Sequence, residues 1–476
     1  MAIIGNPTNI YYEWSTTNKS FIDLANYYRD VGINHYAWPL ILFDPDLAGV
    51  DPFDPRLSRT MKVKILREVT QNPMYFFRNV VRVPVDGVTT GIPFTIHRAN
   101  AALFYCLMMN LNIFLEQPRQ TYKTISSLCW YLYEYNFGAR GSEMSFLNKK
   151  FEDSKLNLAR MKEIRDLLPS YLKMDKPFAP DGTKLKMRDN VESMTHPVNG
   201  NNIRTVPSAR SRTAAASLMR GRTTPIIYID EYAFIVYNKI IYSNMVPAFN
   251  TASNNAKAHN SPYGILITTT PGIMTTEEGL EAWDLLNSAT PFSEKWYDLS
   301  YQEIMDLIGS NQNSNFVYIK YTYKQLGFSE KWFMDLCKTM RNDWDAILRE
   351  VLLNWTVGNE NSPFRREDLD TIRGLVRPPI QTILLLNKFK FDIYQRVNLK
   401  YPPIIGVDVS GGFQRDSSAI TVIDSYSTNV AATMNCNYIS TLELAAVIVE
   451  LVRMMPNAVV NIERNGVAFQ QSQHIR

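Results

Sequence analysis

The chain has 476 residues, and its 45% hydrophobic content is enough to build roughly two or three domains with real cores. With 50 basic and 46 acidic side chains the formal net charge is +4, which excludes a generally basic nucleic-acid coat but not a local basic track. The four cysteines and five histidines show no zinc-ligand spacing, so we expect no zinc site and the reduced cysteines of a cytosolic protein.

The N-terminus, Met-Ala-Ile-Ile-Gly-Asn-Pro, lacks a basic region and a long apolar core, so we expect no signal peptide. Residues 101–115 form the longest apolar stretch, and because Asn110 and Asn112 interrupt it, we expect no membrane span. Residues 1–60 are rich in Asn, Tyr, Pro and Asp, and turn-forming segments such as Asp-Pro-Phe-Asp-Pro at 51–55 predict a loosely structured N-terminal extension.

Residues 61–360 alternate helical patterns with β-branched strands. This pattern predicts one α/β domain with a twisted, mostly parallel sheet and helices on both faces. Residues 361–400, which contain Arg-Pro-Pro at 377–379, are expected to be a linker. Residues 401–476 are expected to begin a second α/β unit.

An apolar run at 113–117 ends in a short polar loop, and a helical pattern follows at 125–135. A strand that delivers a loop to a helix N-terminus places free backbone N–H groups and the positive dipole end where phosphate oxygens bind. In this loop Lys123 is placed to reach the outer phosphates of ATP, and Thr124 is placed to ligate Mg²⁺. The general pattern has glycine where this chain has Tyr122, so the loop alone also fits an ordinary strand-to-helix turn. The candidate ATP-binding residues of the loop are Pro118, Arg119, Gln120, Thr121, Tyr122, Lys123 and Thr124.

A second strand, at 224–229, ends in the adjacent acids Asp230 and Glu231. In nucleotide hydrolases the first acid of such a pair supports the Mg²⁺ shell, and the second polarises the attacking water. A third strand, within residues 263–272, ends in the hydroxyls of Thr268, Thr269 and Thr270. These hydroxyls are placed to sense the γ-phosphate and to couple its loss to movement of neighbouring parts of the protein. Each strand alone fits an ordinary buried parallel strand, but the three in this order indicate a nucleotide hydrolase.

Several arginines fall within residues 208–222, before the strand that ends in Asp230. A guanidinium is always charged and can stabilise charge on a transferring phosphoryl group. Arg220 is one candidate for that role, and Arg119 inside the loop is the other. We expect a solvated or DNA-facing position for the remaining three, Arg210, Arg212 and Arg222.

Residues 403–423 predict a strand, a glycine turn and an antiparallel strand, with Asp408 in mid-strand among apolar neighbours. A carboxylate buried there is costly unless a cation or hydrogen bonds compensate it. A later strand at 458–462 places Glu463 in similar surroundings. Two carboxylates on neighbouring strands are what a two-metal nuclease uses to hold Mg²⁺ or Mn²⁺ on either side of a scissile phosphate.

As an ordered set, these motifs resemble those of the large terminase subunit of tailed bacteriophages, a motor ATPase that packages DNA into proheads. The segments that carry the resemblance lie at 118–124, 220–221, 226–234, 267–271 and 405–410. The resemblance implies a P-loop ATPase domain followed by an RNase H-like nuclease domain.

Several residue roles follow from the resemblance alone. It places Asn100 near a base-reading position and Arg220 where an arginine finger has been proposed. It gives Asp408 and Glu463 the first two acidic positions of the nuclease, and Asp416 a further one. Because the family's third acid lies still nearer the C-terminus, the resemblance implies an incomplete nuclease domain with weak or absent cutting by this chain.

The implied function is ATP-driven translocation of double-stranded DNA into a viral prohead, with ATP and Mg²⁺ at one site and metal-dependent cutting of concatemeric DNA at the other. The implied partners are double-stranded DNA, the portal protein, the small terminase subunit and further copies of the chain in a homo-oligomeric ring. The implied location is the host cytoplasm, with transient docking on the prohead. Two alternatives remain: a helicase-like DNA translocase without nuclease activity, and a non-hydrolysing DNA-binding assembly factor, which Tyr122 makes conceivable.

Overall fold

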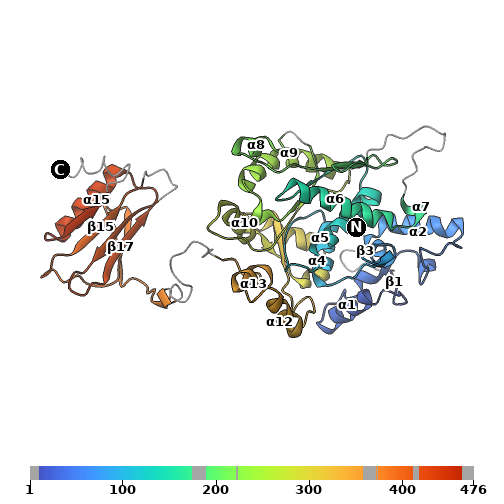
Figure 1. Ribbon diagram of the computed structural model, residues 1–476, viewed down its shortest axis with the longest axis horizontal. Helices are drawn as coiled ribbons and strands as arrows, with labels where there is room; N and C mark the ends of the chain where they lie inside the picture. Colours follow the sequence, from blue (N-terminus) through green and yellow to red (C-terminus); the bar gives the residue numbers. More distant parts are fainter. Residues whose placement is uncertain are drawn as a thin grey trace. The chain divides into compact units, whose positions relative to one another are not determined.

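The computed structural model describes residues 10–173, 189–220, 223–356, 371–372, 374–410 and 417–463. The chain divides into two compact units, one ending at Gly358 and the other beginning at Asn359. Figure 1 shows the first unit in blue to brown and the second in orange to red. Among the described helices, none combines the length and the apolar composition that crossing a bilayer requires.

The first unit is built on an eight-stranded sheet in the order β11-β12-β5-β10-β9-β6-β8-β7. Every neighbouring pair is parallel except β7 and β8, which confirms the predicted mostly parallel α/β architecture. The strands are β5 (Asn112–Glu116), β6 (Glu143–Leu147), β7 (Ser193–Thr195), β8 (Asn202–Thr205), β9 (Ile226–Asp230), β10 (Gly264–Thr269), β11 (Thr290–Pro291) and β12 (Phe316–Lys320).

Helices cover both faces of this sheet. Because side chains alternate along a strand, Leu266 of β10 joins one core while Ile265 and Ile267 join the other. The first core includes residues of α4 (Arg98–Met108), α5 (Lys123–Tyr133) and α6 (Phe151–Asp166), and the second includes residues of α8 (Arg212–Ser217), α9 (Asn238–Ala258) and α10 (Glu277–Ser288). The central strands are therefore buried on both sides, as continuous apolar parallel strands require.

The remaining helices and strands of this unit surround that framework. They are β1 (Tyr11–Tyr12), α1 (Lys19–Asp30), β2 (Ile41–Leu42), α2 (Arg59–Gln71), α3 (Pro73–Tyr75), β3 (Arg82–Val85), β4 (Val88–Pro93), α7 (Ser170–Lys173), α11 (Tyr301–Gly309), α12 (Glu330–Thr339) and α13 (Trp344–Glu350).

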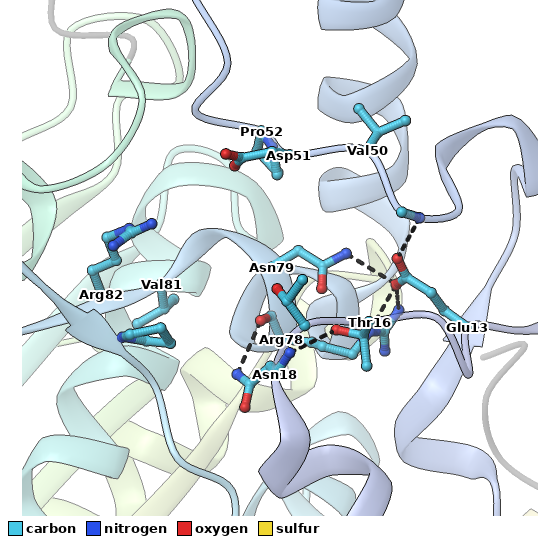
Figure 2. A pocket seen from close by; sticks show the side chains of 13 residues that line it. Glu13, Thr16, Asn18, Val50, Asp51, Pro52, Arg78, Asn79, Val81 and Arg82 are labelled. Atoms are coloured by element: carbon cyan, nitrogen blue, oxygen red, sulfur yellow. Dashed lines mark hydrogen bonds and ion pairs between the residues drawn. The ribbon is translucent and has the colours of Figure 1, made fainter.

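The prediction of a loosely structured extension is wrong for residues 10–60, which pack into the first core. Phe21 and Tyr28 of α1 and the nearby Trp38 are fully buried. Figure 2 shows the polar side of this junction, where the Glu13 carboxylate lies 2.9 Å from the buried Arg78 guanidinium. The turn segment at 51–55 that suggested a loose extension lies between the buried residues Leu47 and Ile65.

The second unit contains a six-stranded sheet in the order β13-β14-β17-β16-β15-β18. Its elements are β13 (Gln381–Leu385), β14 (Phe389–Ile393), β15 (Ile404–Asp408), β16 (Ser418–Ile423), β17 (Val430–Cys436), α15 (Thr441–Met454) and β18 (Val459–Ile462). Strands β15, β16 and β17 are antiparallel neighbours, and after α15 the chain returns as β18, parallel to β15. This confirms a second α/β unit after the first. Leu444, Val447 and Leu451 of α15 pack in its core.

The predicted linker at 361–400 is wrong over β13 and β14. These strands form a hairpin, and β14 pairs with β17, so this part of the chain extends the second sheet. The apolar run at 383–386, followed by the alternation of Phe389, Phe391 and Ile393 with Lys390 and Asp392, was the sequence signal for strands.

Candidate active site

The first candidate site lies at the carboxyl ends of three adjacent strands. Strand β10 lies between β5 and β9, and its Thr268 is in register with both Leu115 and Asp230. Because parallel strands end at the same edge, the loop after β5, the acids after β9 and the hydroxyls after β10 meet there. The structure thus brings together the three motifs that the sequence places far apart.

Asp230 is the centre of this edge. Its carboxylate is 3% exposed and accepts hydrogen bonds from the hydroxyls of Thr268 at 2.6 Å and Thr124 at 3.3 Å. Two side-chain amides add to this set, from Asn157 at 3.3 Å and Asn148 at 3.5 Å. Sequence reasoning missed both asparagines, since neither belongs to a motif and only the folding of β6 and α6 beside β9 brings them near.

Lys123 and Glu231 face each other beside Asp230. The Lys123 side chain is 7% exposed, and its Nζ lies 3.9 Å from Glu231 Oε1, too far for a hydrogen bond. Within the described part of the chain, neither Lys123 Nζ nor Glu231 Oε2 has a hydrogen-bond partner. A buried ammonium without hydrogen bonds is costly, so this position is suited to an anionic group such as a phosphate.

The loop before Lys123 adopts an unusual backbone conformation for its residue types. Gln120 has φ 59° and Tyr122 has φ 67°, in the left-handed region that glycine enters without a steric penalty. Each such non-glycine residue costs about 1–2 kcal/mol. Tyr122 is the N-cap residue of α5 and its side chain is 56% exposed. The loop therefore reaches a helix N-terminus despite the missing glycine.

Arg119 contacts Glu350, the last residue of α13. Its backbone N–H donates to the Glu350 carbonyl at 3.0 Å, and its guanidinium Nε lies 2.5 Å from the Glu350 carboxylate. Burial raises the pKa of Glu350, Glu231 raises it further, and Arg119 lowers it. Glu350 is thus a third acid near this site, and no sequence motif marked it.

Arg220 is the candidate that the structure does not bring to this site. Its side chain is exposed, and its backbone N–H donates to Ser217 at 3.3 Å. Within the described residues, no hydrogen bond or ion pair joins Arg220 to the loop or to Asp230. Of the two candidate arginines, Arg119 is the one that lies in the loop itself, in contact with Glu350. Arg222 lies outside the described residues.

Asn100 has a structural task at the start of α4. Its side-chain oxygen accepts from the His97 N–H at 2.7 Å in a capping box, and its amide donates to the Thr95 carbonyl at 3.1 Å. Burial lowers the pKa of the capping His97 to about 4. Since Asn100 is 1% exposed and its polar atoms are engaged, its geometry offers no support for the expected base contact.

The three threonines after β10 have different surroundings. Thr268 bonds to Asp230, whereas the Thr269 hydroxyl accepts the backbone N–H of Ala233 at 3.2 Å in the turn after Glu231. The Thr270 hydroxyl is buried and has no hydrogen-bond partner among the described residues. The end of β10 is therefore bonded directly to Asp230 and to the turn that follows Glu231.

The second candidate site lies at the end of β15 in the other unit. Val407 is in register with Ile462, and the Glu463 N–H donates to the Val407 carbonyl at 3.0 Å, so Asp408 and Glu463 are neighbours across two parallel strands. Both side chains are exposed, which corrects the prediction that Asp408 is buried in mid-strand: it is the last residue of β15.

No third ligand completes this pair within the part of the chain that the structure describes. Asp416 lies outside the described residues, and no group of three or more His, Cys, Asp or Glu side chains arranged to hold a metal ion occurs among those described. Asp408 and Glu463 thus supply two carboxylate groups, a donor type that suits a hard divalent cation.

Comparison with known proteins gives structural matches only. No protein-family model matches the chain, and no curated protein matches it. The ATPase domain of the Thermus phage P74-26 large terminase matches with 14% identity and a TM-score of 0.37, over 55% of this chain and 95% of that one. The large terminase of another thermophilic bacteriophage, in complex with ADP, matches with 10% identity and a TM-score of 0.36, over 80% of this chain and 79% of that one. The same terminase in complex with ATP-gamma-S matches with 9% identity and a TM-score of 0.32, over 80% and 78%. All three of these solved structures are phage large terminases, and at these scores the assignment of function rests on the geometry described above.

Proposed function

We propose that this chain is a viral DNA-packaging motor subunit that hydrolyses ATP to translocate double-stranded DNA into a prohead and cuts concatemeric DNA with its second unit. The observation that carries the proposal is the contact of Asp230 with both Thr124 and Thr268. Beside them lies the buried Lys123 ammonium, which has no hydrogen-bond partner among the residues that the structure describes. These are the groups that phosphate binding, metal binding and coupling to movement require.

The residues around Asp230 fit ATP with Mg²⁺. Thr124 and Asp230 offer a hydroxyl and a carboxylate 3.3 Å apart, which are oxygen ligands of the kind Mg²⁺ prefers. Bound Mg²⁺ would neutralise charge on the phosphates. Lys123 binds the outer phosphates through its Nζ, and the N-terminal N–H groups of α5 add to that binding.

Glu231 is the proposed general base. Its Oε2 has no hydrogen-bond partner among the described residues, so it can accept a hydrogen bond from the attacking water and orient it toward the γ-phosphate. Arg119 stabilises the charge that develops on the phosphate oxygens. Thr268 and Thr269 connect the site to the turn after Glu231, so loss of the γ-phosphate is passed to β10 and its neighbours.

The second unit is the proposed nuclease. Asp408, Glu463 and Asp416 would hold Mg²⁺ or Mn²⁺, which polarises the scissile phosphate and activates water. The adjacency of Asp408 and Glu463 favours this function over that of a helicase-like translocase, which gains nothing from two exposed carboxylates at one sheet edge.

The assembly proposed for this function follows the terminase resemblance. A homo-oligomeric ring of this chain would bind duplex DNA and dock on the portal protein of the prohead in the host cytoplasm. The small terminase subunit would be a further partner.

Steady-state ATP hydrolysis, with and without duplex DNA, tests the proposal. We expect DNA-stimulated turnover by the parent chain and its loss in Lys123→Ala and Glu231→Gln. Lys257→Ala and Glu163→Gln change exposed residues of α9 and α6 and serve as matched controls with parental turnover. If the parent chain is folded and assembled but shows no ATP turnover, the motor proposal fails, and the non-hydrolysing DNA-binding assembly factor becomes the better proposal.

A further inference from the structure

The phosphate loop holds two left-handed residues without the help of glycine, and the structure shows what fixes them. Gln120 and Tyr122 flank Thr121, whose carbonyl accepts a hydrogen bond from the Gln117 side-chain amide at 2.5 Å. The Thr121 hydroxyl in turn donates to the Pro118 carbonyl at 2.5 Å. The loop is therefore closed on itself by two side-chain-to-backbone bonds.

These two bonds lie where water does not compete for them. Gln117 and Thr121 are each 1% exposed. A buried carbonyl that loses its donor cannot exchange it for solvent, so removal of the Gln117 amide leaves the Thr121 carbonyl only the nearby His97 ring, whose pKa this carbonyl raises against the larger effect of burial, and loosens the backbone on either side of Thr121.

The α5 side of the loop is fixed separately. The Tyr122 carbonyl accepts both the backbone N–H and the hydroxyl of Ser126 at 2.9 Å, which anchors the N-cap residue to the first turn. Lys123 is the first residue of α5, so the conformation of residues 120–122 sets where Lys123 Nζ and the free N–H groups of the helix point.

We propose that Gln117 is the positioning residue of this site, and that its bond to the Thr121 carbonyl keeps a glycine-poor loop in its phosphate-binding conformation. Gln117 comes directly after β5, so it fixes the loop to the rigid sheet. In this account the exposed Tyr122 is tolerated because Gln117 holds the backbone that glycine would otherwise adopt freely. The inference rests on the proposed ATPase function and extends it to a residue outside the motifs.

The proposal predicts a particular kinetic signature. Without the Gln117–Thr121 hydrogen bond the loop samples other conformations, and only the chains with the loop in its phosphate-binding conformation bind ATP. The apparent affinity for ATP then falls in proportion to the fraction of such chains. Saturating ATP selects the competent conformation, so turnover at saturation is preserved. We expect Gln117→Met, which keeps the length of the side chain without its donor, to raise KM for ATP about tenfold with kcat within about twofold of the parent.

Rescue separates positioning from a general packing defect. Tyr122→Gly lowers the cost of the left-handed conformation, so we expect Gln117→Met/Tyr122→Gly to recover most of the lost affinity. Asn311→Leu is the matched control, since its amide also donates to a backbone carbonyl, that of Ser288 at 2.8 Å, but outside the site. It should leave KM unchanged.

Hydrogen–deuterium exchange of the nucleotide-free full chain provides a readout that does not depend on ATP turnover. The peptide spanning residues 117–126 should exchange faster in Gln117→Met than in the parent. In Gln117→Met/Tyr122→Gly the exchange of this peptide should differ from that in both other chains, while the affinity for ATP is restored. Parental exchange and parental KM in Gln117→Met would overturn the proposal, and so would a KM defect that Tyr122→Gly does not reduce. If the parent chain shows no turnover, the ATPase proposal fails, and the exchange of this peptide alone decides the role of Gln117.

Discussion

The hydrogen bond between Thr268 and Asp230 makes the sharpest prediction about the proposed ATPase site. At 2.6 Å it is the shortest of the four side-chain bonds to this carboxylate, and Thr268 is fully buried. Valine has nearly the shape of threonine but no hydroxyl, so Thr268→Val removes the bond without opening a cavity. The Thr268 hydroxyl also lies 3.5 Å from the buried Tyr228 hydroxyl, so the variant changes the surroundings of Tyr228 as well as the orientation of Asp230.

The expected size of the effect follows from the charge and burial of this bond. A hydrogen bond to a charged group contributes about 1.5–3 kcal/mol, and each 1.36 kcal/mol is about tenfold in rate. Thr124, Asn148 and Asn157 still hold Asp230 in the variant, so the lower part of this range applies. We expect kcat/KM for ATP hydrolysis to fall about 10- to 30-fold in Thr268→Val.

The assay is steady-state phosphate release with ATP varied across KM, accompanied by thermal unfolding. Thr251→Val is the control, because the Thr251 hydroxyl also bonds to one acceptor, the Pro247 carbonyl at 3.2 Å, but on an exposed part of α9. A Thr268→Val chain with kcat/KM within twofold of the parent would refute the role assigned to this bond. So would a loss of activity that is matched by the control.

Three further predictions concern other parts of the chain. Arg78→Met leaves the buried Glu13 carboxylate without its ion pair, so urea unfolding should show a loss of about 3–5 kcal/mol, and a loss below about 1 kcal/mol would mean that this junction is not integral to the first unit. Burial raises the pKa of Glu134 from 4.5 to about 8, so the folded chain retains a proton that the unfolded chain releases; stability is fully present below about pH 4.5 and declines as pH rises toward 8. Glu134→Gln stays neutral and should show a weaker decline in unfolding free energy between pH 5 and pH 8, whereas identical slopes would contradict the burial of an ionisable group there. Asp408→Asn should abolish any Mg²⁺- or Mn²⁺-dependent nicking of plasmid DNA while ATP turnover is retained, and unchanged nicking would remove Asp408 from the proposed nuclease site.

The parts of the site that follow from sequence are those carried by strand order. Asp230 ends β9, Thr268 is the last residue but one of β10, and Lys123 follows β5 after the loop at 117–122. Parallel pairing brings the ends of these strands to one edge. That reasoning needs no distances, since any mostly parallel sheet with β5, β10 and β9 adjacent gives the same result.

The residues that sequence reasoning missed reach the site by packing. Asn157 lies on α6 and Glu350 on α13, and their contacts with Asp230 and Arg119 depend on how those helices cross the sheet edge. A polar residue on a helix carries no pattern that distinguishes a buried contact from a solvated face. Gln117 was overlooked for a similar reason, because its role depends on a backbone conformation that composition does not reveal.

Two errors came from giving turn residues too much weight. Prolines and aspartates in residues 10–60 suggested a loose segment, although Phe21, Leu24, Ala25 and Tyr28 recur at helical spacing and are buried. For the same reason, the prolines at 378–379 led us to predict a linker where the chain forms β13 and β14. In both regions the apolar periodicity was the better guide, since burial supplies most of the stability and turns only connect the buried elements.

Separate measurements of nucleotide binding and of hydrolysis test whether the sheet edge around Asp230 is an ATPase site. Binding of a fluorescent ATP analogue and single-turnover hydrolysis of labelled ATP would be measured on the parent, Lys123→Ala and Glu231→Gln chains. We expect Glu231→Gln to bind nucleotide as the parent does but to fail to hydrolyse it, and Lys123→Ala to lose binding. Parental hydrolysis in Glu231→Gln, or parental binding in Lys123→Ala, would contradict the assignment of this sheet edge as an ATPase site.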